Sequence, residues 1–128
     1  MALPRPLCTR LPRDIESVLE ARFEALDWAP SEGLRAIVGE WLALQRFPSL
    51  EFRDTAFGRR AAVRGGPEVW EVAQGAGEER RVGPALESHF SWVARAGLEE
   101  ALAYAEAFPG EIRKILERNR RLASGGDA

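Results

Sequence analysis

The chain has 128 residues, of which 45% are hydrophobic and 30% are charged, and its formal net charge is −2. This length suits one ordinary domain or two small modules. Small modules are marginally stable alone, so two modules would favour an oligomer. The weak negative charge gives no overall positive field, so any contact with nucleic acid has to be local. A single cysteine, Cys8, excludes an internal disulfide framework and a cysteine-based zinc site. A single histidine, His89, weakens the case for catalysis by a nucleophile and a base.

The first twelve residues carry prolines where a signal peptide needs an apolar run, and no segment approaches about 18 unbroken apolar residues. We therefore expect a cytoplasmic protein with no membrane contact. The same segment holds two arginines and no acid, and its run 7–11, between Pro6 and Pro12, predicts one short strand.

Two amphipathic helices are expected next. Apolar side chains recur at helical spacing from Arg13 to Leu26, and a second helix is predicted from Pro30 to about Phe47. The apolar stripe of the second helix consists of Leu34, Ile37, Val38, Trp41, Leu42 and Gln45. Gly33 and Gly39 each cost this helix about 1 kcal/mol relative to alanine. Close backbone approach would explain them, and tolerated glycines are equally possible.

Pro48 marks the expected boundary between a module over residues 1–47 and a second over 48–122, with a disordered tail over 123–128. The second module should open with a hairpin, in which residues 50–54 and 59–64 flank a turn through Gly58. A short helix then opens at Pro67, and three further helices are expected over residues 84–90, 97–108 and 110–122. The expected fold class is therefore mainly α.

One strand and two helices cannot close a core, because a lone strand leaves its hydrogen-bonding edges open. The simplest partner is the same strand from a second copy, which gives an antiparallel ribbon over four helices. At the strand-to-helix junction Arg10-Leu11-Pro12-Arg13-Asp14-Ile15, and at Pro30-Ser31-Glu32, the sequence resembles the ribbon-helix-helix family of DNA-binding proteins over about residues 5–46.

This resemblance implies a homodimer bound to an operator in DNA. Alternate strand residues would face the major groove, where Arg10 can bond guanine at O6 and N7. The start of the second helix would hold a phosphate with backbone N–H groups. The expected DNA-binding residues are Arg5, Cys8, Arg10, Arg13 and Ser31. A pure dimerisation module with no DNA role is the alternative.

The second half resembles a bacterial family known as domain of unknown function 433, commonly described as antitoxin-like. The likeness covers residues 50–122 and lies in Phe52-Arg53-Asp54, the run from Gly58 to Gly65, Val69-Trp70-Glu71-Val72, His89-Phe90, Trp92, Ala101-Leu102-Ala103-Tyr104 and Pro109-Gly110-Glu111-Ile112. It implies a trihelical core like a helix-turn-helix and a toxin partner such as a PIN-like ribonuclease.

In a core of this type, the third helix, over residues 97–108, is the candidate for the recognition helix that enters the major groove. Its exposed candidates, Glu99, Glu100 and Glu106, would repel phosphate, so we expect them to bind a basic protein partner instead. The arginines of Gly58-Arg59-Arg60 are expected to be solvated in an ordinary turn, and a phosphate clamp is the alternative. Three aromatic residues are expected in the core: Trp70, Trp92 and Tyr104.

No residues are spaced for catalysis. His89 has no serine, cysteine or threonine placed by a motif as its nucleophile, and the Glu78–Arg81 run is typical of a solvated loop. We therefore expect no enzyme activity, no cofactor and no metal. The expected function is a DNA-binding antitoxin or an autoregulating repressor of a toxin–antitoxin pair; the alternative is a dimeric protein-interaction module with no DNA-binding role.

Overall fold

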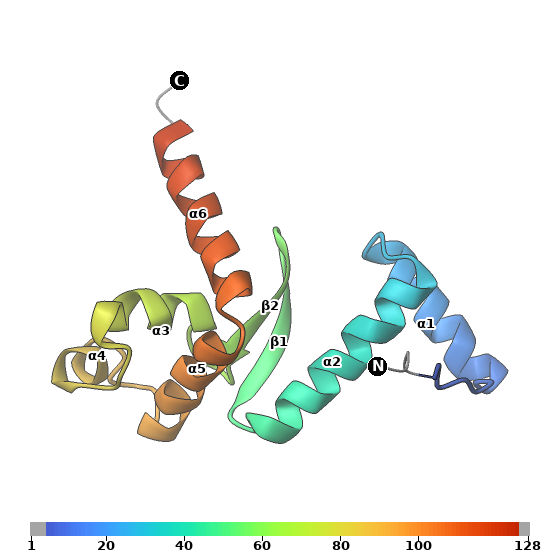
Figure 1. Ribbon diagram of the computed structural model, residues 1–128, viewed down its shortest axis with the longest axis horizontal. Coiled ribbons are helices and arrows are strands. Elements are labelled where there is room, and N and C mark those ends of the chain that lie inside the picture. The colour runs from blue at the N-terminus through green and yellow to red at the C-terminus, as the bar shows by residue number, and fades with distance from the viewer. Residues whose placement is uncertain (1–4, 126–128) are drawn as a thin grey trace. The chain divides into compact units, whose positions relative to one another are not determined.

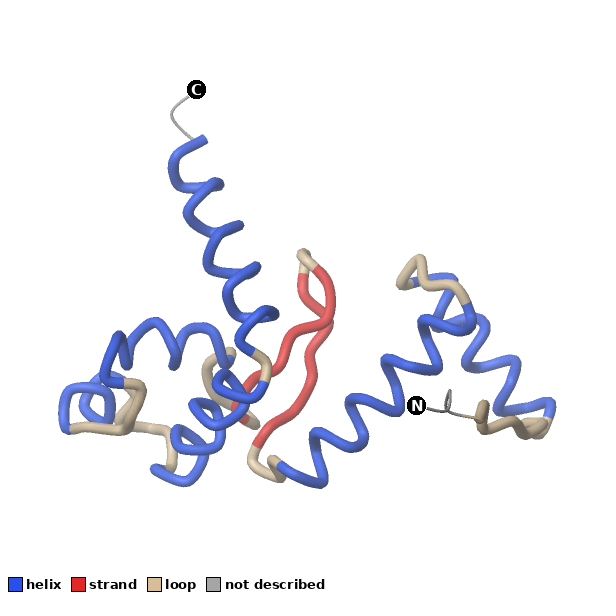
Figure 2. The backbone as a smooth tube through the Cα atoms, in the orientation of Figure 1, coloured by secondary structure: helices blue, strands red, loops and turns tan. Residues whose placement is uncertain are grey.

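The structure is a computed structural model, and it describes residues 5–125. That part of the chain contains six α-helices, a short 3-10 turn and one two-stranded antiparallel sheet (Figures 1 and 2). The mainly helical fold expected from the sequence is confirmed. The chain divides between Gly39 and Glu40 into two compact units.

The first unit is a helical hairpin. Helix α1 (Arg13–Ala25) is followed by helix α2 (Pro30–Arg46), which continues past Gly39 into the second unit. Both helices lie where the apolar spacing predicts them. Ala29 precedes α2, and its carbonyl accepts the first helical hydrogen bond, from the N–H of Gly33. The proline at the first helical position needs no such bond, because it has no N–H to satisfy.

The turn between these helices is closed by backbone hydrogen bonds. Asp27 lies in the left-handed region with φ 56°. The N–H of Trp28 donates to the carbonyl of Phe23, and the N–H of Asp27 donates to that of Glu24. This is the Schellman arrangement, and the two aromatic rings that flank it supply the apolar contact that usually accompanies it, with centroids 6.4 Å apart.

The strand predicted over residues 7–11 is not formed in the single chain, so this prediction is wrong for one copy. Residues 5–12 have no regular secondary structure. A strand needs a hydrogen-bonded neighbour, and the sheet of the described chain lies mid-chain, at residues 50–63, rather than at the N-terminus. The first four residues of the module expected over 1–47 lie outside the described part.

The second unit opens with the predicted hairpin. Strand β1 (Leu50–Thr55) pairs antiparallel with β2 (Gly58–Val63), and Leu50 lies opposite Val63. At the tip, the N–H of Phe57 donates to Thr55 Oγ1. Gly58 has φ 107°, a backbone conformation that residues other than glycine rarely adopt. The position of this turn is therefore fixed by a glycine.

Four helices complete the second unit: α3 (Val69–Ala76), α4 (Pro84–His89), α5 (Arg95–Ala107) and α6 (Pro109–Gly125). A 3-10 turn, η1 (Gly77–Glu79), follows α3. Each helix predicted after the hairpin is present, and α5 begins two residues earlier than expected. Helix α6 continues through residues 123–125, which we expected to be disordered, and 126–128 lie outside the described residues.

The core of this unit lies between the hairpin, α3 and α5. Tyr104 is its aromatic centre, and its ring makes edge contacts with Phe47 and Phe52 at centroid distances of 5.6 and 6.2 Å. The largest fully buried side chains are Leu50, Val69, Val72 and Leu98. The prediction that Tyr104 lies in the core is confirmed. Trp70 is partly buried, whereas Trp92 is 68% exposed, so the prediction for Trp92 is wrong.

Candidate functional site

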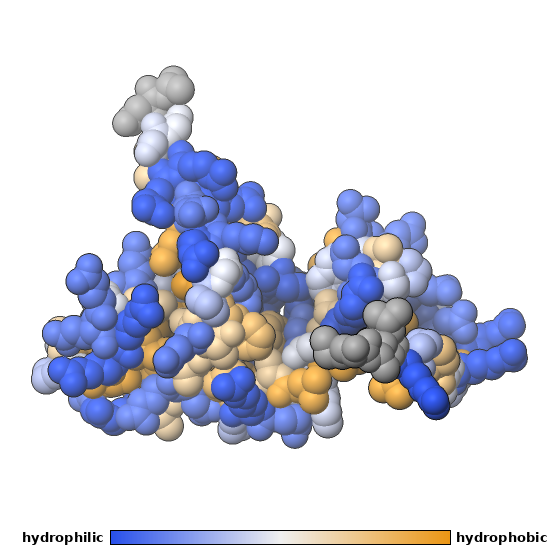
Figure 3. Space-filling view, in the orientation of Figure 1, coloured by the Kyte–Doolittle hydropathy of each residue, from blue (hydrophilic) through white to orange (hydrophobic). Residues whose placement is uncertain are grey.

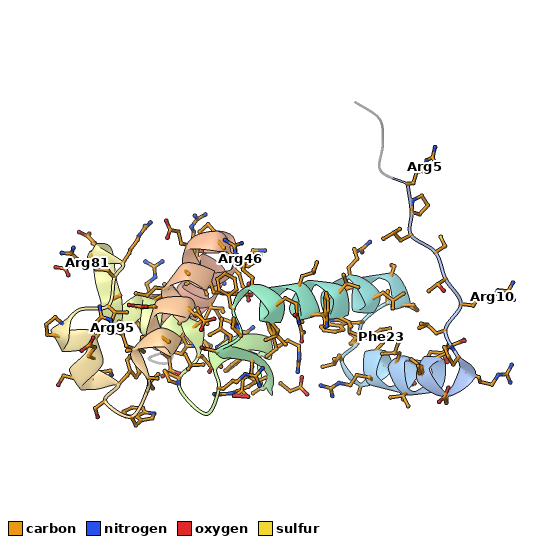
Figure 4. All side chains as sticks on the ribbon, turned by 90° about the horizontal axis from the view of Figure 1, so that it is seen from below. Arg5, Arg10, Phe23, Arg46, Arg81 and Arg95 are labelled. Carbon is orange, nitrogen blue, oxygen red and sulfur yellow. The ribbon has the colours of Figure 1, made fainter. Side chains whose placement is uncertain are left out.

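The cationic N-terminal segment is fully accessible. Arg5, Cys8 and Arg10 are exposed on the irregular segment, and Arg13 is exposed at the start of α1. Figure 4 shows the side chains of Arg5 and Arg10 pointing away from the helices. Within residues 5–125, no ion pair or side-chain hydrogen bond involves these three arginines. Their charges are therefore available to a ligand.

Ser31 lies apart from those residues in the sequence, in the first turn of α2, and it is exposed. The positive end of the helix dipole favours an anion at this turn. Glu32 lies in the same turn and is also exposed, so it adds a negative charge there. The first turn of α2 is consequently a weaker anion site than a helix start without an acid.

An apolar stripe on α2 lacks any covering element in the described chain. We call the set Leu34, Ile37, Val38, Trp41 and Leu42 the α2 stripe. These five side chains are between 38% and 60% exposed, although their spacing is that of a buried helix face. On α1, Ile15 and Val18 are exposed as well. Apolar surface is visible in this part of the space-filling view (Figure 3), and contiguous surface of this kind marks an interaction site.

The three acids proposed to bind a partner do not form one free acidic face. Glu99 accepts a hydrogen bond from Arg95 Nε at 2.9 Å, one turn away on α5. Glu100 accepts one from the backbone N–H of Ser49 at 3.2 Å and so holds α5 to the chain that enters β1. Glu106 is exposed and has no ion pair among the described residues. Of the three, only Glu106 keeps its full charge available to a partner.

Sequence reasoning missed a cationic cleft between the tip of the β-hairpin and α6. The cleft has a volume of about 480 Å³. The charged and aromatic side chains that line it are Phe57, Arg59, Arg60, Glu111, Lys114 and Arg118. The spacing of Lys114 and Arg118, four residues apart on one helix, is the signal that could have suggested it. The expectation of a protein partner rested on three acids of the predicted helix over residues 97–108 and did not consider the cations that follow that helix.

The hairpin arginines are not solvated turn residues, so that prediction is wrong. Arg59 donates hydrogen bonds to Glu40 and to Asp54, and the bond to Glu40 is the main cause that raises the pKa of Arg59. Arg60 is only 7% exposed and lies 3.6 Å from Glu68 Oε1. Arg60 lies beside Glu68, which precedes α3, and lines a cleft together with residues of α6, and the hairpin sequence indicates neither neighbour.

The described residues show no further group of side chains arranged for catalysis or metal binding. His89 is exposed and its ring meets Phe90 edge-on, with centroids 4.6 Å apart. Within the described part, no three histidine, cysteine, aspartate or glutamate side chains gather as a metal site. No described helix is both long enough and apolar enough to cross a bilayer.

No family model, curated protein or solved structure matches the chain. The resemblances to the ribbon-helix-helix family and to domain of unknown function 433 therefore remain expectations from the sequence.

Proposed function

We propose that the protein is a dimeric, DNA-binding repressor of the ribbon-helix-helix type, which regulates its own synthesis and acts as the antitoxin of a toxin–antitoxin pair. The observation that carries this proposal is the exposed α2 stripe, together with an unpaired, acid-free N-terminal segment. Within the described residues of one chain, nothing covers the α2 stripe and no strand pairs with residues 7–11. A second copy of the chain would provide an apolar surface for the stripe and a strand for the segment.

Dimerisation follows from the cost of exposing apolar surface. Burial of a large aliphatic or aromatic side chain stabilises a protein by about 1.5–3 kcal/mol at most. The five side chains of the α2 stripe are half exposed or nearly so, and burying them against their copies would recover a large part of that energy. Residues 7–11 of two chains would then pair as an antiparallel ribbon and satisfy each other's backbone groups.

The three free arginines of the same segment support the proposed DNA binding. In a ribbon, alternate side chains point to one face, so Arg10 and Cys8 would share the face that enters the major groove. Arg10 has the fork of donors that reads guanine, while Arg5 and Arg13 are suited to phosphates. The toxin would bind residues 48–122, where Glu106 offers a free charge to a basic partner.

The test is a DNA-binding titration of the full chain against the region upstream of its own gene and against random duplex, over a range of salt concentrations. We expect salt-dependent binding that favours the upstream region. Arg10→Ala should cost about 1–3 kcal/mol against the specific site and little against random DNA. Arg81→Ala, an equal change of charge at an exposed position in the second unit, is the control.

Three outcomes would contradict parts of this proposal. If Arg10→Ala weakens both duplexes equally, Arg10 contacts phosphate and the base-reading role is wrong. If the protein is a dimer with no saturable DNA affinity at low salt, the alternative of a protein-interaction module replaces the repressor. If the protein is a monomer at micromolar concentration, the ribbon itself is excluded.

A further inference from the structure

We propose that the cleft between the β-hairpin tip and α6 binds a phosphate group, held by Arg60, Lys114 and Arg118. The site lies in the second unit, for which the proposed function names only a protein partner. It is therefore independent of the N-terminal segment and of the α2 stripe.

The first observation is a buried guanidinium without hydrogen bonds. The side chain of Arg60 is 92% buried, since only 8% of it reaches solvent. Its nearest acid is Glu68, at 3.6 Å, which is beyond hydrogen-bonding distance, and Glu68 Oε1 is itself without a hydrogen bond. The ion pair with Glu68 offsets the charge of Arg60, but a guanidinium has five N–H donors, and no side-chain hydrogen bond occupies them within the described residues. Arg60 borders the cleft, so an oxyanion there could accept from it.

The second observation is that other cations converge on the same place. Lys114 and Arg118 lie on successive turns of α6 and line the cleft. The guanidinium carbon of Arg118 is 4.4 Å from the centre of the Phe57 ring, and that of Arg60 is 5.4 Å from it. Cation–π contacts thus hold both guanidiniums near one ring before any ligand arrives. An anion between like charges would relieve their repulsion.

The nearby acids are already engaged. Arg59 also lines the cleft, but Glu40 and Asp54 bind its guanidinium. Glu111 borders the cleft, and its Oε2 accepts a hydrogen bond from the hydroxyl of Tyr104 at 2.7 Å. Lys114 and Arg118 have no ion pair with any described residue. Glu68 pairs with Arg60, and Glu111 keeps its negative charge at the cleft, because the Tyr104 hydroxyl that bonds it is neutral. Lys114 and Arg118 therefore outnumber the one uncompensated acid that lines the cleft.

A phosphate matches this donor set better than a carboxylate does. It offers three or four oxygens, so two guanidiniums and an ammonium can each bond a different one. The volume of about 480 Å³ leaves room for the group that the phosphate carries. Phe57 and Ile115 supply apolar surface beside the cations. A phosphate of a free nucleotide and one of a nucleic-acid strand would use the same donors.

The test is isothermal titration calorimetry of the full chain with three probes: inorganic phosphate, adenosine monophosphate and a short single-stranded oligonucleotide. Lys114→Gln with Arg118→Gln removes two cleft cations at partly or fully exposed positions, so the fold should survive. The matched control, Arg113→Gln with Arg120→Gln, removes two exposed cations of the same helix that do not line the cleft. Figure 3 shows how hydrophilic the visible surface of α6 is, which makes this control necessary.

We expect saturable binding by the wild-type protein, a loss of tenfold or more in the cleft variant, and less than threefold in the control. Tighter binding of the oligonucleotide than of the mononucleotide would assign the phosphate to a strand; equal binding would assign it to a free nucleotide. Equal losses in both variants, or no saturable binding of any probe, would overturn the proposal.

This outcome is separable from the proposed function. Arg10→Ala should leave phosphate binding in the cleft unchanged, because Arg10 lies in the other unit. The cleft variant should keep its preference for the upstream duplex. The two experiments therefore distinguish a protein that binds upstream DNA but no phosphate in the cleft from a protein that binds phosphate in the cleft but not upstream DNA.

Discussion

The ring of Phe23 occupies the space that a side chain at Gly33 would need. A Cβ on Gly33 would lie 2.7 Å from Phe23 Cγ, and two other ring carbons would be nearer still. Real Cβ atoms do not approach other atoms this closely, so the glycine is required by the contact between α1 and α2. Gly39, on the same helix, has open space around the position of its absent Cβ. Close approach thus explains Gly33, whereas Gly39 is merely tolerated.

Replacing these two glycines by alanine should therefore have opposite effects. Gly33→Ala should destabilise the protein by about 1–3 kcal/mol, because the Phe23 ring has to move. Gly39→Ala should stabilise it by about 1 kcal/mol through helix propensity alone. Urea unfolding of the full chain, followed by helical circular dichroism, measures both. A stabilising Gly33→Ala would show that the α1–α2 contact is looser than described.

Adding a charge to the α2 stripe should separate the dimer. Val38 is largely exposed in the single chain, so Val38→Glu should cost little within one copy and much where two copies meet. We expect the dimer dissociation constant to rise at least about tenfold, equivalent to about 1.4 kcal/mol. Analytical ultracentrifugation measures it. Gln74→Glu adds the same charge at an exposed position of α3 and should leave the dimer intact.

Glu100 and Glu106 should differ although both are acids of α5. Glu100→Ala removes the acceptor of the Ser49 N–H and should destabilise the chain by about 1–3 kcal/mol. Glu100→Gln keeps an acceptor oxygen and should recover most of that loss. Glu106→Ala should stay within about 0.5 kcal/mol, because Glu106 is exposed and makes no ion pair in the described part. Chemical denaturation of the three variants ranks them.

The stability of the protein should fall in alkali because of Tyr104. Burial, and the hydrogen bond from its hydroxyl to Glu111, raise the pKa of Tyr104 above its ordinary value. The folded chain then keeps the phenol neutral where the unfolded chain loses the proton. Its stabilising effect is therefore complete below about pH 10 and declines above it by up to about 1.4 kcal/mol per pH unit.

Tyr104→Phe should remove this part of the alkaline decline while lowering stability at neutral pH, since Glu111 loses its donor. Because Tyr104 is the only tyrosine, near-ultraviolet tyrosinate absorbance reports on it alone. Ionisation of the folded protein at the ordinary tyrosine pKa would contradict the buried environment.

The helices and the hairpin could be predicted because their signals are local. The apolar spacing in α1 and α2, and the glycine at the hairpin tip, act over a few neighbouring residues. The strand predicted at residues 7–11 is not formed in one chain, because a short apolar run does not encode the neighbour that a strand needs.

The candidate cleft could not be predicted, because its members come from segments about fifty residues apart. Nothing in Arg59-Arg60 indicates that the first residue binds Glu40 while the second is buried beside α6. Trp92 shows the same limit: aromatic residues are usually buried, and its exposure depends on the turn between α4 and α5.

The exposed α2 stripe also has a consequence for how the amount of protein translates into activity. If the stripe pairs two copies, each functional particle requires two chains to meet. At concentrations well below the dissociation constant, the paired form then rises with the square of the chain concentration, so doubling synthesis yields about four times as many dimers. The unpaired chain, with Trp41 and its neighbours in water, is the form that chaperones and proteases capture. Synthesis and degradation would together set a threshold below which the protein is present but inactive.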